Sequence, residues 1–280
     1  MGRTKKKILT ALLAAAVLLA ACESAPPAQG EDEYPVYTDY QDVPGVTADE
    51  IAAIESLREQ TDAFVYGMNL TTESFYGETG EIMGYAKWFC AWLTELFGIP
   101  FEPAIYEWGD LIDGLESGEI DFTGELTATA ERRETYFMTD AIAERSVKYM
   151  QVAGSEALSE ITGKRPLRYA FLTGTTTADA VLGQSQDAVE SFFIEDYDTA
   201  YAMLKSGEID AFFDEDIAEA AFDVYGDVVA ENFFPLVYGP VSLTAQDPSR
   251  KPVISVVQKI LQNGGAHHLT ELYNLGQREA

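Results

Sequence analysis

Residues 108–142 read WGDLIDGLESGEIDFTGELTATAERRETYFMTDAI, and the rest of the chain is organised around them. Positions 110–117 carry leucine and isoleucine on one side, which predicts a short helix, and Gly118 suits its C-terminal cap. Ile120 and Phe122 then alternate with polar neighbours, as in a strand with one covered face. This part of the stretch therefore predicts a helix followed directly by a strand.

The second half of the stretch indicates an anion site. We expect the chain to turn at 125–129 and to begin a new helix at Ala130, with Thr129 as its N-cap. Arg132 and Arg133 fall in the first turn of that helix. Helix N-termini favour negative charge, so two arginines there oppose the helix dipole unless an anion joins them. We therefore expect half of a binding site for an acidic ligand group, with Arg132 in the site and Arg133 on the surface.

A seven-residue string occurs twice. LESGEID at 115–121 returns as LKSGEID at 204–210. The glycines at 118 and 207 are 89 residues apart, which is too long for the repeat of a solenoid. The spacing suits a chain with two similar α/β lobes, each of which uses one copy of the string for a helix–strand step.

The alternation of helical and strand patterns predicts an α/β fold. Helices and short apolar strands alternate from residue 47 to 142, as in a parallel sheet with helical crossovers. The clearest helix, 85–96, carries an aromatic stripe, which we interpret as core. A second α/β run begins at Leu167, and extended segments near 150 and 237 enclose it. Two such crossings make a hinge between two lobes.

This pattern divides the chain into four parts. We expect a signal peptide at 1–21, an acidic tether at 22–46, lobe 1 at 47–150 plus 238–280, and lobe 2 at 151–237.

The N-terminus has the features of an export signal. A basic start precedes an apolar run at 8–21, which is shorter than the roughly 20 residues that span a bilayer. The run ends in LAAC, which resembles the bacterial lipoprotein signal and implies a lipid on Cys22. The alternative is an ordinary secretory cleavage site that a cysteine happens to follow. Cys90, the other cysteine, is expected to be buried and inert, so no disulfide is expected.

Composition excludes some partners without naming any. The formal net charge is −29, and such a surface repels nucleic acid and anionic lipid headgroups. Aromatic residues make up 12% of the chain, enough for a packed core.

A second anion cradle is expected at residues 174–176, Gly-Thr-Thr, between a strand and a helix. Glycine lets the backbone approach a ligand, hydroxyls donate, and the helix start supplies free amides. An N-cap without any ligand is an equal alternative for this loop taken alone. Together with Arg132, Thr175 and Thr176 would clamp one small carboxylate from the opposite lobe. No Walker sequence or GxGxxG is present.

Acidic residues follow the strand expected after the second copy of the repeated string. Residues 214–216, Asp-Glu-Asp, lie at its expected carboxyl end, where ligands of open α/β sheets bind, and an acid there can pair with an ammonium. A solvated acidic turn is the alternative for Asp214 and Asp216. His267 and His268 are adjacent and point apart, so we expect no metal site, no catalytic triad and no cofactor.

These motifs together resemble the extracellular solute-binding proteins of family 3, the polar amino-acid receptors of ABC importers. The resemblance covers about residues 64–276. It is carried by WGDL at 108–111 with the first repeat string, by TAER at 129–132, and in the second lobe by GTT at 174–176 with the second string. It implies a two-lobed periplasmic-binding-protein (Venus flytrap) type 2 fold that closes on its ligand.

The resemblance also implies roles for individual residues. Arg132 would bind the α-carboxylate of the ligand, helped by Thr127 and Thr176. Glu215 takes the place of an aspartate that binds the α-ammonium, and Phe75 falls near the aromatic residue that covers the ligand. Trp108 matches a signature residue whose role is packing.

The sequence also departs from the family pattern. Residues 84–89, GYAKWF, lack both acids of the usual GFDxDL. Glu125 replaces a small or apolar residue close to the ligand, where it favours an additional cationic group.

The resulting hypothesis is a non-enzymatic receptor, lipid-anchored on the outer side of a bacterial cell membrane. It would bind a small polar solute, an amino acid or a related amine or carboxylate, and deliver it to an ABC permease as a monomer. One alternative is a sensor that signals to a membrane partner. Another is a dehydratase acting on prephenate or arogenate, with Glu125 or Glu215 as the general acid.

Overall fold

In the computed structural model, which describes residues 34–280, helices alternate with the strands of a nine-stranded mixed sheet. The unit that contains this sheet is Pro35–Ala280. The expected signal peptide, Cys22 and the first part of the tether, 22–33, lie outside the described residues. None of the helices described is long and apolar enough to cross a membrane.

The first lobe is built around the parallel strands β4, β1 and β5, which pair in that order. Its elements are η1 (Tyr40–Asp42), α1 (Ala48–Gln60), β1 (Phe64–Met68), β2 (Phe75–Tyr76), β3 (Ile82–Met83), α2 (Tyr85–Phe97), β4 (Phe101–Ile105), α3 (Trp108–Ser117), β5 (Phe122–Leu126), α4 (Arg132–Thr135), η4 (Pro248–Arg250), α9 (Lys251–Gln262) and α10 (Ala266–Gln277).

The second lobe is built around β9, β7 and β8, again parallel and in that order. Its elements are α5 (Leu158–Ile161), β7 (Leu167–Leu172), α6 (Thr177–Gln184), β8 (Val189–Ile194), α7 (Tyr197–Ser206), β9 (Ala211–Glu215), η2 (Asp216–Ala218), α8 (Glu219–Phe222), η3 (Asp223–Tyr225) and β10 (Val228–Asn232).

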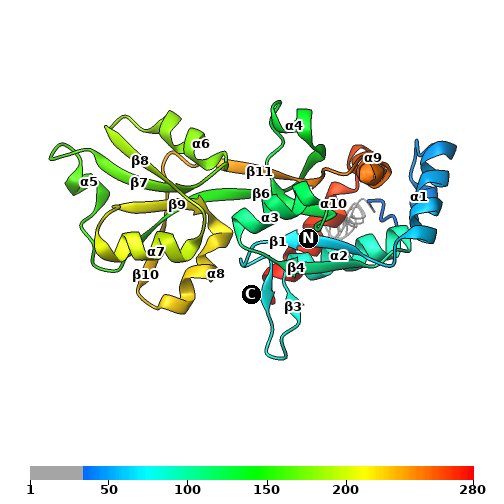
Figure 1. Ribbon diagram of the computed structural model, residues 1–280, viewed down its shortest axis with the longest axis horizontal. Coiled ribbons are helices and arrows are strands. Elements are labelled where there is room, and N and C mark those ends of the chain that lie inside the picture. Colours follow the sequence, from blue (N-terminus) through cyan, green and yellow to red (C-terminus); the bar gives the residue numbers. More distant parts are fainter. Residues whose placement is uncertain (1–33) are drawn as a thin grey trace, which may run out of the picture. The chain divides into compact units, whose positions relative to one another are not determined.

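Two antiparallel strands, β6 (Phe137–Val152) and β11 (Tyr238–Ala245), run between the lobes and join them (Figure 1). β11 pairs with β5 of the first lobe, and β6 pairs with β9 and β10 of the second. Arg145 of β6 and Gly239 of β11 are register partners in this antiparallel pair. These strands confirm a mixed α/β fold with two lobes; the residue limits given above for the lobes stay a prediction.

The repeated string folds the same way in both lobes. Gly118 and Gly207 are the C-caps of α3 and α7, with φ of 79° and 70°. These are left-handed conformations that glycine adopts without strain. Each string then leads into a strand, β5 or β9. The predicted helix–strand step is therefore confirmed in both copies.

The aromatic stripe of α2 lies in the core of the first lobe, as predicted. Phe89 and Leu93 are fully buried there, and Trp92 is nearly so. Cys90 is buried as well, and burial raises the pKa of its thiol, so this cysteine is an inert core residue.

Several expected elements were wrong in detail. The extended segment expected near 150 is only the end of the 16-residue β6. The helix expected at 110–117 begins earlier, at Trp108. Glu125 lies in β5 rather than in a turn, because the chain stays paired with β11 through Leu126. The helix expected from Ala130 is the single turn α4, which starts at Arg132.

Candidate ligand-binding site

A pocket lies between the two lobes, beside the carboxyl ends of β5 and β9. Its free space is small, about 30 Å³, which is room for on the order of two water-sized groups. Its lining residues are Asn69, Thr71, Trp108, Glu125, Thr127, Arg132, Leu172, Thr175, Thr176, Thr177, Tyr197, Asp214, Glu215, Ile217 and Ala218.

Arg132 supplies the cationic end of the pocket. Its Nη1 donates to the carbonyl of Thr127 (3.0 Å) in its own lobe, and its Nη2 donates to the carbonyl of Gly174 (2.7 Å) in the other. The Thr129 hydroxyl accepts from the Arg132 backbone N–H (3.1 Å), as expected of a residue at a helix start. Burial lowers the pKa of the guanidinium. Because carbonyls hold the side chain without neutralising it, its charge stays available to an anion.

Hydroxyl groups from both lobes surround this cation. Thr176 donates to Thr127 across the pocket (3.4 Å), and the hydroxyl of Thr175 donates to the carbonyl of Leu172 (2.9 Å). The predicted Gly-Thr-Thr loop therefore does face Arg132.

Two further contacts tie the lobes together at this point. The indole N–H of Trp108 donates to the carbonyl of Thr173 (2.7 Å), and the backbone N–H of Thr72 donates to the carbonyl of Ile217 (3.0 Å).

Arg145 binds the carboxylates at the acidic end of the pocket. No pattern in the sequence indicated this residue. This side chain is only 1% exposed, on β6. Its Nε and Nη2 donate to the two carboxylate oxygens of Glu73 (3.1 and 2.7 Å). Its Nη1 lies 2.7 Å from an oxygen of Glu125 and 2.7 Å from an oxygen of Glu215. One guanidinium thus links carboxylates of the first lobe to a carboxylate of the second.

The ionisation of these groups reflects their burial. Burial alone would lower the pKa of Arg145, but the surrounding carboxylates raise it well above its ordinary value. Burial raises the pKa of Glu215 to about 8, although Arg145 opposes the shift. Burial also raises the pKa of Asp214 to about 6, despite hydrogen bonds from the Glu215 N–H and the Tyr197 hydroxyl. The carboxylates at the acidic end therefore outnumber the positive charge that Arg145 supplies.

Phe75 is placed differently from the other predicted site residues. It lies half-buried on the short hairpin β2–β3 and does not line the pocket. Asn69 and Thr71 line the pocket instead, from the loop that follows β1. The side-chain amide of Asn69 donates to the carbonyl of Tyr106 (3.0 Å), which fixes that loop. No sequence signal marked these two residues.

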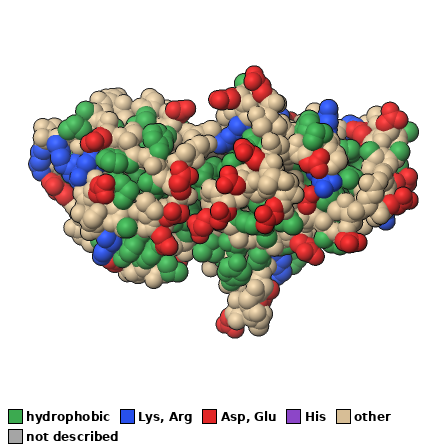
Figure 2. Space-filling model, in the orientation of Figure 1, with side chains coloured by type: hydrophobic (Ala, Val, Ile, Leu, Met, Phe, Trp, Pro, Cys, Tyr) green, Lys and Arg blue, Asp and Glu red, His purple; other side chains and the backbone are tan. Residues whose placement is uncertain are grey.

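A second, wider hollow of about 610 Å³ lies next to the pocket and shares Tyr197 with it. Five of its lining residues are acids: Glu107, Asp110, Glu195, Asp196 and Asp198. Burial and three of the neighbouring aspartates raise the pKa of Glu107. Figure 2 shows acidic side chains across the middle of the visible face. In the described part of the chain, no group of three or more His, Cys, Asp or Glu is arranged to hold a metal ion.

Two lobes joined by two strands, with a polar pocket between them, are the geometry of a binding protein that closes on its ligand. The model of the bacterial extracellular solute-binding proteins, family 3, matches residues 65–275. The chain belongs to this family. No curated protein sequence matches it.

Several solved structures share the fold at low identity. The amino-acid ABC transporter substrate-binding protein AbpA of Streptococcus pneumoniae, bound to L-arginine, is 15% identical, with a TM-score of 0.60 over 80% of this chain and 98% of its own. An ancestral amino acid-binding protein, a precursor of cyclohexadienyl dehydratase, is 18% identical, with a TM-score of 0.56 over 79% and 98%. The periplasmic domain of BvgS from B. pertussis is 16% identical, with a TM-score of 0.67 over 87% of this chain and 46% of its own.

Proposed function

We propose that this family 3 protein is an extracytoplasmic receptor that binds a small polar solute carrying a carboxylate, an amino acid or a related amine or carboxylate. The observation that carries the proposal is Arg132. Its guanidinium lines the pocket, is held by carbonyls of both lobes and forms no ion pair with a described carboxylate. A ligand carboxylate supplies the missing charge in bidentate geometry.

The opposite end of the pocket suits an amine. Glu125 and Glu215 line the pocket there and present carboxylate oxygens to it. An amino acid has the matching order of charges, with its carboxylate at Arg132 and its ammonium at Glu215. Thr127, Thr175 and Thr176 would complete the carboxylate site. We propose Phe75 as a contact for a ligand that extends toward the β2–β3 hairpin.

Closure of the lobes would couple binding to a signal. A ligand held by Arg132 of one lobe and Glu215 of the other gains full contact only when the lobes meet, so it shifts the protein toward the closed state. We propose that the two lobes move relative to each other by bending of the paired strands β6 and β11. Lobe 1 is 47–150 plus 238–280, and lobe 2 is 151–237.

The cellular setting is part of the proposal. The lipoprotein-like LAAC and Cys22 support a lipid anchor at the outer face of the cell membrane, with 22–46 as a tether. Family membership supports delivery to an ABC permease by a monomeric receptor rather than catalysis. Metabolic labelling with a fatty-acid analogue tests the anchor, and Cys22→Ala would abolish the label.

The binding role is tested by calorimetry. A thermal-shift screen of amino acids and amines selects a ligand, and its affinity is then measured for Arg132→Ala. Loss of one partner of a buried charge pair costs roughly 2–5 kcal/mol, or about 30- to 3000-fold in affinity. Arg133→Ala is the matched control, because Arg133 is the exposed neighbour whose guanidinium donates to the carbonyls of Met138 and Thr139. Unchanged affinity in Arg132→Ala would refute the assignment.

Two other roles each have one supporting observation. One is a sensor that signals to a membrane partner, and the chain shares its fold with the periplasmic domain of BvgS. The resemblance to a dehydratase precursor, together with the raised pKa of Glu215, supports a general acid acting on prephenate or arogenate. Co-purification with a membrane kinase would favour the first, and turnover of prephenate or arogenate by the purified protein would favour the second.

A further inference from the structure

Three carboxylates converge on the buried guanidinium of Arg145. Glu73 uses both of its oxygens on Nε and Nη2. Glu125 and Glu215 share the remaining nitrogen, Nη1, at 2.7 Å each. The Glu125 oxygen and the Glu215 oxygen that accept from Nη1 therefore lie no farther apart than the sum of these two distances. Like charges so close together in a site shielded from water disfavour each other's ionised form.

Among the described residues, no second cation forms an ion pair with these carboxylates. Arg132 is the further cation of the pocket, and it is held at the opposite end by two carbonyls. Asp214 adds a fourth carboxylate next to Glu215, and Asp216 follows on η2, bonded to the hydroxyl of Ser146.

The remaining titratable groups around the cluster are tyrosines. They are Tyr66 on β1, Tyr85 on α2, Tyr197 on α7 and Tyr273 on α10, and burial, followed by electrostatic interaction with these carboxylates, raises the pKa of each. They stay neutral, so they add no charge at physiological pH. The acidic end thus holds more carboxylates than Arg145 neutralises.

We propose that this end of the pocket binds the primary ammonium group of a ligand in exchange for a proton held on Glu215. The proposal rests on the function proposed above, because it concerns the same pocket. The ammonium keeps its own proton and its positive charge, while the carboxyl of Glu215 becomes a carboxylate and its proton passes to solvent. Ligand binding would therefore strengthen as the pH rises.

Glu215 is the member of the cluster placed for this exchange. Its side chain is 17% exposed, compared with 0% for Glu73 and 4% for Glu125. Both oxygens of Glu73 and both of Glu125 accept hydrogen bonds, the second oxygen of Glu125 from the Asn69 N–H (3.2 Å). Glu215 uses one oxygen on Arg145 and lines the pocket. The raised pKa of Glu215, about 8, agrees with a proton at neutral pH.

The size of the pocket selects the probe. Its small free space, about 30 Å³, favours a primary ammonium over a bulkier quaternary one. Methylammonium chloride therefore tests the acidic end alone, because it has no carboxylate for Arg132. Tetramethylammonium chloride is the matched control, with the same charge and no N–H donor.

The experiment measures the dissociation constant of methylammonium at pH 6.0 and pH 8.5, at constant ionic strength, from thermal-shift titrations. We expect binding roughly 10- to 100-fold weaker at pH 6.0, where the carboxyl must first lose its proton. Tetramethylammonium should give no shift beyond that of sodium chloride. In Glu215→Gln the pH dependence should disappear, while Glu208→Gln, an exposed acid outside the pocket, should behave as the wild type.

A second measurement needs no ligand. The side-chain carboxyl ¹³C resonance of Glu215, assigned by its loss in Glu215→Gln, should titrate with a midpoint near or above neutrality in the free protein. A midpoint below pH 5, equal affinity at the two pH values, or a pH dependence that survives in Glu215→Gln would each overturn the proposal. These results would leave Arg132-dependent amino-acid binding intact. Unchanged affinity in Arg132→Ala would instead refute the proposed function and leave the titration of Glu215 to be judged by itself.

Discussion

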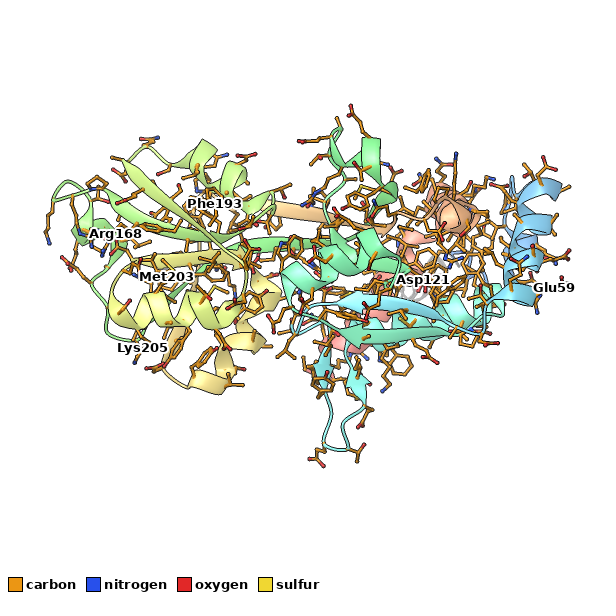
Figure 3. All side chains as sticks on the ribbon, in the orientation of Figure 1. Glu59, Asp121, Arg168, Phe193, Met203 and Lys205 are labelled. Carbon is orange, nitrogen blue, oxygen red and sulfur yellow. The ribbon has the colours of Figure 1, made fainter. Side chains whose placement is uncertain are left out.

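The two copies of the repeated string show how one scaffold serves two different halves of a site. In both lobes a helix ends at a left-handed glycine, and the aspartate that ends the string ties down the neighbouring strand. Asp121 accepts from the N–H of Val65 (2.8 Å) and pairs with Arg250 (2.8 Å). Asp210 accepts from the N–H of Arg168 (2.8 Å) and pairs with the guanidinium of the same residue (2.9 Å). Figure 3 shows Asp121 and Arg168 in different lobes.

The copies diverge four residues further on, where the strands reach the pocket. Glu125 of β5 and Asp214 of β9 stand at the same distance from their strings, but they have different partners. Glu125 pairs with Arg145 (2.7 Å), whereas Asp214 accepts from the Tyr197 hydroxyl (3.0 Å). Conserving the scaffold while changing the strand ends lets one lobe present Arg132 and the other present Glu215. The repeated string therefore positions equivalent strands in the two lobes. The residues that follow it determine which charged groups reach the pocket.

The largest effect should come from removing the cation that links the two strand ends. Arg145→Met removes the cationic partner of three carboxylates and should destabilise the protein by about 3–5 kcal/mol. Lys148→Met is the control on the same strand. Its partner Glu219 is exposed, so we expect a loss below about 1 kcal/mol. Urea unfolding followed by circular dichroism measures both, and equal losses would contradict a special role for Arg145.

The acids at the two ends of β9 should give pH effects of opposite sign. Burial alone would raise the pKa of Asp210, but hydrogen bonds from Arg165 and Arg168 lower it to about 2, so its stabilisation is present above about pH 4 and is lost as the pH falls toward 2. Glu215 and Asp214 have raised pKa values, of about 8 and 6. Their contribution is complete below about pH 4 and is lost as the pH rises through those values.

The free energy of unfolding, measured without ligand from pH 5 to 8.5, should therefore fall with rising pH, by on the order of 2 kcal/mol. Glu215→Gln should flatten this decline, because glutamine cannot ionise. Asp210→Asn is the comparison at the other end of the strand and should leave the decline unchanged while lowering stability throughout. A decline of the same size in Glu215→Gln would show that other groups cause it.

The smallest effects should come from the shared scaffold. An added methyl group at Gly118 or Gly207 meets no atom within 4 Å, so alanine at either position costs only the left-handed conformation, about 1–2 kcal/mol. The two losses should be equal within error. Gly183→Ala in α6, where space is also open and φ is not left-handed, should stabilise by roughly 0.5–1 kcal/mol. Thermal unfolding of the three variants measures this, and unequal losses would mean that the two copies are not equivalent.

Local signals explain what could be predicted from the sequence. The helix predicted at 85–96 and the start of the second run at Leu167 agree with α2 and β7, because helical periodicity and an apolar run mark them directly. Arg132 could be singled out because its charge opposes the dipole of its own helix.

Non-local contacts explain what was missed. The strand β6 was underestimated because its first half runs between the lobes and alternates charged and buried residues irregularly. Glu125 was assigned to a turn because Gly124 reads as a breaker; in the structure a side chain there would collide with the hydroxyl of Tyr66, so the glycine permits close packing. Arg145 resembles a solvated strand arginine, because its partner Glu73 lies 72 residues away in the sequence.

We expect Arg132 and Glu215 to hold the two ends of one ligand. A crystal structure with the amino acid that gives the largest thermal shift tests it most directly. We predict the ligand carboxylate within hydrogen-bond distance of the Arg132 guanidinium and the ligand ammonium at the free oxygen of Glu215. A ligand bound elsewhere, with Arg132 still bonded only to the carbonyls of Thr127 and Gly174, would contradict the account.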